Sequence, residues 1–152
     1  MTHFAASYPD ARVIATAGVG KKQPKARIDE PLGQSPDPSW GTDLDQIALE
    51  GMDRLNEVVF FHRPSKSLIV TDLVFNVPRD IPLLPRIFTR LSGTYGRLGV
   101  SRLLKRWMVS DTEAFLRSVE RLYAWPFTRV IMTHGDIFAG GPQEFKPLFD
   151  NY

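Results

Sequence analysis

The sequence contains no cysteine, and this absence excludes three kinds of site. Without thiols, the chain has no disulfide, no thiolate ligand for a metal ion and no cysteine nucleophile. Histidine is also scarce, since His3, His62 and His134 are the only three. A metal ion would therefore have to be held by a few imidazole nitrogens together with carboxylate oxygens.

Long apolar runs are absent as well. No segment approaches the roughly 20 apolar residues that a membrane-spanning helix needs. Residues 1–13 lack the basic and apolar regions of a signal peptide. We therefore predict a cytoplasmic protein with no membrane span.

The rest of the composition is typical of a globular domain, with 43% hydrophobic and 24% charged residues among 152. A chain of this length can bury a hydrophobic core, and we predict a single domain over residues 1–152. The net charge is only +2, so the total demands no polyanionic partner and nucleic acid is not expected.

The order of strand-like and helix-like segments predicts an α/β or α+β fold in which helices cover a mixed sheet. Two apolar segments, 57–62 and 67–75, flank turn residues and predict a hairpin. Helical spacing of apolar residues is found in 83–91, 100–108 and 110–125. The other predictions are the end of a helix at 3–8, a strand over 11–18, a surface excursion over 20–40, a helix or edge strand over 43–52, a last strand over 127–136 and a short helix over 142–152.

Two of the predicted strands run into side chains that can bind a cation. Asp72 follows the apolar residues LIVT, and His134-Gly135-Asp136 follows VIMT. Because ligands gather at the carboxyl ends of strands in α/β folds, this pattern predicts a site for zinc, iron or manganese. The alternative is local: Asp72 caps a loop by accepting backbone N–H bonds, and His134 is a hydrogen-bonded residue at the rim of the sheet.

These segments also resemble those of a known superfamily. SLIVTDLVFN, residues 67–76, resembles the strand that delivers the metal-bridging aspartate in metallo-β-lactamase-fold proteins. RVIMTHGD, residues 129–136, resembles the strand that ends in the last metal histidine. More closely, residues 57–77, the region of Trp40 and residues 125–141 resemble a divergent branch of unknown function, of the domain of unknown function 4336 type, over most of the chain from Phe4 onward.

The resemblance implies a metal site made of Asp72, His134 and Glu57, with His3 as a further candidate ligand. Glu57 lies about where the superfamily has another metal histidine, and Asp136 would orient His134 or act as a catalytic base. The superfamily's HxHxDH motif does not occur here. The resemblance therefore implies a partial or truncated metallo-β-lactamase-like sandwich, incomplete at its N-terminus, whose exposed apolar sheet would favour a homodimer or poor solubility.

The segment from Ile81 to Ser110 has no acidic residue. Its cations are Arg86, Arg90, Arg97, Arg102, Lys105 and Arg106, and aromatic residues are interleaved with them. Such a segment can bind an anionic membrane or nucleic acid, or it can be a solvated helical face whose arginine stems cover apolar surface. Our hypothesis is that Arg86, Arg90 and Arg102 bind an anionic group of a small-molecule substrate.

Two functions follow from these patterns. The first is a metal-dependent hydrolase acting on an ester, amide, thioester or phosphoester. The second is a degenerate, metal-free fold that acts as a binding module through the basic segment 86–106. Stoichiometric metal that is lost on substitution of Asp72 or His134 would distinguish the first from the second.

Overall fold

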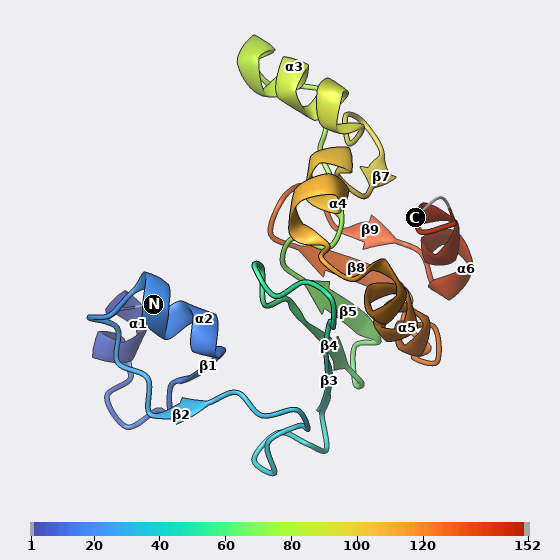
Figure 1. The fold of residues 1–152 in the computed structure, drawn as a ribbon. Coiled ribbons are helices and arrows are strands. Elements are labelled where there is room, and N and C mark those ends of the chain that lie inside the picture. The colour runs from blue at the N-terminus through green and yellow to red at the C-terminus, as the bar shows by residue number, and fades with distance from the viewer. Residues whose placement is uncertain (1, 151–152) are drawn as a thin grey trace. The chain divides into compact units, whose positions relative to one another are not determined.

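The computed structural model describes residues 2–150, without the side chains of residues 2–4, 17, 103 and 104. The chain forms two compact units, Met1–Gln34 and Ser35–Tyr152 (Figure 1). The prediction of one domain over residues 1–152 stays a prediction. The mixed α/β architecture predicted from the sequence is confirmed.

The first unit contains α1 (Thr2–Ser7), β1 (Ile14–Ala15), α2 (Ala17–Lys22) and β2 (Glu30–Pro31). Strands β1 and β2 pair in parallel. The strand predicted over 11–18 is therefore wrong in extent, because helix α2 begins at Ala17. The pairing with β2 covers only Ile14 and Ala15, and the Leu32 N–H donates to the Ala15 carbonyl at 2.9 Å just beyond it.

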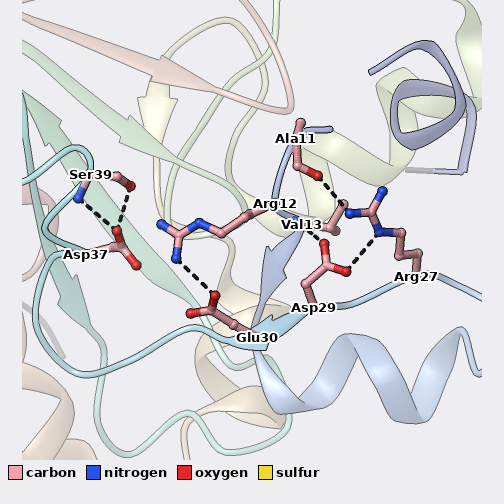
Figure 2. A network of polar contacts seen from close by, with 8 residues as sticks. All are labelled: Ala11, Arg12, Val13, Arg27, Asp29, Glu30, Asp37 and Ser39. Carbon is pink, nitrogen blue, oxygen red and sulfur yellow. Dashed lines mark hydrogen bonds and ion pairs between the residues drawn. The ribbon is translucent and has the colours of Figure 1, made fainter. Parts of the chain in front are cut away.

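Polar contacts link the segments of this first unit (Figure 2). The Arg27 guanidinium donates to the Asp29 carboxylate at 2.8 Å and to the Ala11 carbonyl at 3.1 Å. The Val13 N–H also donates to Asp29, and both bonds lower the pKa of that carboxyl, with the Arg27 bond the stronger cause. Arg12 pairs with Glu30 at 2.9 Å in a solvent-exposed ion pair.

The second unit is built on a five-stranded mixed sheet in the order β3-β4-β5-β8-β9. The strands are β3 (Leu44–Ala48), β4 (Val58–His62), β5 (Ser67–Val70), β8 (Arg129–Met132) and β9 (Phe138–Ala139). The predicted hairpin is confirmed as β4 and β5, and the ambiguous segment 43–52 forms the edge strand β3. Strand β8 is not the last one, because β9 returns antiparallel to it.

One face of this sheet carries the hydrophobic core. The register places Phe61, Leu68 and Val130 in one row across three strands, and none is more than 4% exposed. Helix α5 (Thr112–Leu122) belongs to the same core through Phe115 and Val119, both fully buried. Asp111 caps the helix, since its carboxylate accepts the Ala114 N–H at 3.0 Å.

The C-terminal segment adds an aromatic cluster to that core. It consists of α6 (Pro142–Phe145) and the short 3-10 helix η1 (Lys146–Leu148). Phe145 packs edge-on against Phe127 at 5.6 Å between ring centroids and also lies near Phe149, 5.4 Å away.

The opposite face of the sheet carries the row Phe60, Ile69 and Ile131, which is only half-buried.

Between β5 and α5 lies an insert that contains β6 (Phe75–Asn76), α3 (Leu83–Ser92), β7 (Leu98–Gly99) and α4 (Arg102–Met108). Strands β6 and β7 pair antiparallel, and both predicted helices of this region are confirmed. Helix α3 lies beyond α4 and away from the sheet (Figure 1). Among the described helices, none has the length and apolar character needed to cross a membrane.

Candidate active site

Asp72 and His134 lie beside each other at the carboxyl ends of two neighbouring strands. Strands β5 and β8 run parallel with Val70 opposite Met132, so the residues that follow them leave the sheet at the same edge. His134 Nε2 lies 3.2 Å from Asp72 Oδ1. The two side chains, predicted from separate motifs, therefore converge on one point.

His134 is positioned from two sides. Its ring stacks on that of Phe75, with 5.4 Å between centroids and 9° between planes. Its carbonyl accepts the Asn76 N–H at 3.2 Å. The imidazole is thus held with Nε2 towards Asp72 while its side chain stays 54% exposed, which leaves the pair accessible from solvent.

The backbone after His134 is fixed by the same asparagine. Gly135 has φ +118°, and a Cβ at this position would lie 2.1 Å from the Asn76 carbonyl oxygen, so only glycine fits. The Asp136 N–H donates to that carbonyl, and Asn76 Nδ2 donates to the Asp136 carbonyl at 3.0 Å. Asp136 is therefore held by its backbone while its side chain is exposed, and its catalytic role stays a prediction.

Glu57 is buried beneath the site, at 3% exposure. One carboxylate oxygen accepts the Thr71 N–H at 2.6 Å, and the other accepts the Asp72 N–H at 3.3 Å. Burial raises the pKa of Glu57 above its ordinary value, although the backbone bonds act in the opposite direction. The structure thus shows Glu57 holding the backbone that carries Asp72, and its role as a metal ligand stays a prediction.

A cavity of about 510 Å³ opens beside the Asp72–His134 pair. Its walls are mainly apolar and come from Leu55, Phe75, Phe88, Trp107 and Met108, with hydroxyl groups from Thr89, Ser92, Thr94 and Ser101. Helices α3 and α4 therefore line the candidate site. From this region the sequence indicated arginines as substrate-binding residues, and it did not indicate these apolar residues.

The three arginines predicted to bind substrate do not line this cavity. Arg86 donates to the Ile81 carbonyl at 3.0 Å, and Arg90 lies over the Tyr95 ring, 4.9 Å from its centroid. Arg102 lines a different cavity of about 430 Å³, together with Arg97 and Lys105. Substrate binding by these three arginines stays a prediction.

The Asp72–His134 pair fits part of a metal site. Two ligands about 2.0–2.1 Å from a tetrahedral zinc ion lie about 3.3 Å apart. The observed 3.2 Å therefore suits a shared cation as well as a hydrogen bond. Among the described residues, however, no group of three His, Asp or Glu side chains could hold a metal ion. The side chain of His3 lies outside the part of the chain that the structure describes.

The fold is similar to that of solved metallo-β-lactamases. The DIM-1 metallo-β-lactamase has a TM-score of 0.56 and 18% identity, with 98% of this chain and 62% of that one covered. The metallo-β-lactamase from Pontibacter korlensis has a TM-score of 0.55 and 16% identity, covering 99% and 63%. The TMB-1 structure has a TM-score of 0.56 and 14% identity, covering 98% and 61%. The chain thus spans about three fifths of these proteins, and the likeness shows the fold.

The sequence comparison supports the same placement. No curated protein matches the sequence significantly. A family model described as Domain of unknown function (DUF4336) matches residues 4–91, which is more than half of the chain. The chain therefore belongs to the DUF4336 family and has a partial metallo-β-lactamase fold.

Proposed function

We propose that this protein is a metal-dependent, hydrolase-like protein whose site is centred on Asp72 and His134. The observation that carries the proposal is the 3.2 Å approach of the two side chains at adjoining strand ends, beside a cavity of about 510 Å³. A cavity of this size can hold a small organic molecule. Because its walls are mainly apolar, we propose a substrate with an apolar group next to the bond that is cleaved.

The protein's own residues would have separate tasks in such a site. Asp72 and His134 would act as ligands of a divalent cation, and Glu57 would keep Asp72 in place through the two backbone N–H groups. A bound divalent metal would polarise a carbonyl or phosphoryl oxygen and lower the pKa of a water molecule. Phe75 would keep the His134 ring oriented, and the apolar wall would limit the access of bulk water.

Metal binding by matched variants tests this proposal. We expect the purified protein to bind zinc or manganese at one equivalent and to gain thermal stability with it, because a ligand of the native state stabilises that state. Asp72→Ala and His134→Ala should each weaken binding by about tenfold or more. The control is His62→Ala, since the His62 ring bonds to Ser65 in the hairpin turn and this substitution should leave the affinity unchanged.

The proposal fails if metal binds the Asp72 and His134 variants as tightly as the wild type, or if no metal stabilises the wild type. If metal binding is instead lost in these variants, hydrolysis of a panel of ester, thioester and phosphoester substrates would establish the substrate class.

A second candidate is a non-catalytic binding module that keeps the fold without the chemistry. It is favoured by the finding that, among the described residues, two candidate metal ligands converge rather than three. A stable protein that gains nothing from added metal, but retains a partner through the basic insert, would support this alternative.

A further inference from the structure

Helix α3 presents a continuous apolar face to solvent. Leu84, Ile87, Phe88 and Leu91 follow the i, i+3, i+4, i+7 spacing of one helical face. Their exposed fractions are 79%, 48%, 61% and 71%, and Leu83 is 66% exposed as well. Single exposed apolar residues are normal, but a contiguous face of this kind marks an interaction surface.

The same insert is strongly cationic. No acidic residue occurs between Ile81 and Ser110, while six arginines and lysines do. Trp107 of α4 is also 65% exposed. A short amphipathic helix with neighbouring cations and an exposed tryptophan has the composition of helices that lie in the interface of an anionic membrane. The ten residues of α3 are too few to span a bilayer.

The charge also argues against a second copy of this chain as the occupant. A two-fold symmetric contact would bring the same surface of two protomers together. Here that would place two cationic segments, each lacking carboxylates, against each other at a cost in repulsion. An anionic occupant with an apolar interior satisfies both the charge and the exposed leucines.

A cavity at the C-terminal end of α3 offers a place for phosphate. The helix ends at Gly93, which has φ +82°, and the Arg97 Nε donates to its carbonyl at 3.2 Å. Arg102 packs beside the same glycine, so a Cβ there would lie 3.2 Å from Arg102 Nε. Arg97, Arg102 and Lys105 line this cavity of about 430 Å³. Both arginines thus lie next to Gly93 at one cavity, where their positive charges favour an anion such as a phosphate, which can accept hydrogen bonds from guanidinium groups.

We propose that α3 and this cationic cavity dock the protein on an anionic phospholipid membrane. The apolar face of α3 lies among the acyl chains near the headgroups, and the cavity takes a lipid phosphate. Phe88 belongs both to this face and to the wall of the Asp72–His134 cavity, so the docked surface borders the candidate active site. The proposal does not depend on whether that site binds a metal ion.

Vesicle co-sedimentation with the full chain tests the proposal. We expect binding to vesicles in which about a third of the phosphatidylcholine is replaced by phosphatidylserine, and weak binding to phosphatidylcholine alone. Binding should fall as salt is added, because the lipid charges are screened. Soluble inorganic phosphate should not compete at equal salt if the membrane, rather than free phosphate, is the ligand.

Matched variants separate the apolar and the cationic contributions. Leu84→Asp should weaken vesicle binding by about tenfold or more, because it replaces an apolar side chain among the acyl chains with a charged carboxylate. Tyr8→Asp makes a similar change at another exposed position, in the first unit, and should have little effect. Arg97→Gln and Arg102→Gln should each weaken binding about fivefold, whereas Arg117→Gln, on the exposed surface of α5, should not.

Three results would overturn the proposal. The first is a wild-type protein that stays in the supernatant with anionic vesicles at low salt. The second is equal binding by Leu84→Asp and Tyr8→Asp. The third is a concentration-dependent dimer in analytical ultracentrifugation that Leu84→Asp abolishes, since the face would then be a contact between copies of this chain. Circular dichroism spectra that match the wild type show that each variant is folded.

Discussion

Helices α3 and α5 follow the same amphipathic pattern but have opposite surroundings. Phe115 and Val119 of α5 are completely buried against the sheet. Phe88 and Leu91 of α3 are 61% and 71% exposed. The spacing of apolar residues therefore specified both helices correctly, but it did not specify what would cover each apolar face.

The difference shows which part of the second unit stabilises the fold and which part is available for binding. The sheet and α5 bury their apolar rows within the unit. The insert leaves the apolar face of α3 uncovered, and its segment from Ile81 to Ser110 carries cations and no carboxylates. The dimerisation predicted from an exposed sheet stays a prediction. The exposed large apolar side chains lie mainly on the insert, and the sheet's second face is half-buried.

The largest expected effect comes from truncating one phenylalanine on each helix. Phe115→Ala should lower the free energy of unfolding by about 3–5 kcal/mol, because it leaves a cavity in the core. Phe88→Ala should change it by less than about 0.5 kcal/mol, since the side chain is largely exposed. Urea unfolding monitored by circular dichroism measures both. Equal losses would show that α3 is packed in solution, and the contrast between the two helices would disappear.

The carboxylates offer a smaller contrast of the same kind. Glu57 is buried just before the start of β4, and burial raises its pKa, whereas Glu120 on α5 is exposed. A folded state with a raised carboxyl pKa binds its proton more tightly than the unfolded chain does. The contribution of Glu57 to stability is therefore complete below its ordinary pKa and is lost as the pH rises through the raised value.

Glu57→Gln should remove this pH dependence, because the neutral amide resembles the protonated acid. We expect the free energy of unfolding of the wild type to fall, relative to the variant, as the pH rises above the ordinary carboxyl range. Glu120→Gln should follow the wild type. Parallel curves for the wild type and Glu57→Gln would mean that the pKa of Glu57 is not raised in solution.

Much of the site could be predicted because its signals are local. An apolar strand that ends in Asp72 and another that ends in His134 are visible in the sequence, and the parallel pairing of β5 and β8 brings the two ends together. The hairpin and the three longer helices were predicted for the same reason, since their periodicity is contained in short windows.

Features that depend on distant partners were predicted poorly. The strand expected over 11–18 pairs with β2 over Ile14 and Ala15, and β9 forms by pairing with β8. Glu57 is spaced like a ligand, but its carboxylate bonds to backbone groups at Thr71 and Asp72, far along the chain. The apolar cavity forms where residues of α3 and α4 face the loops that carry Asp72 and His134, which no local pattern indicates.

The most direct test of the central claim uses the three histidines of the chain. Long-range nitrogen NMR of the imidazole rings distinguishes His3, His62 and His134, with His62→Gln and His3→Gln as assignment variants. On titration with zinc, we expect the Nε2 resonance of His134 to shift to that of a metal-bound nitrogen while the ring of His62 is unchanged, and we expect Asp72→Ala to abolish the shift. An unchanged His134 ring at saturating zinc, or a shift that persists in Asp72→Ala, would contradict the claim.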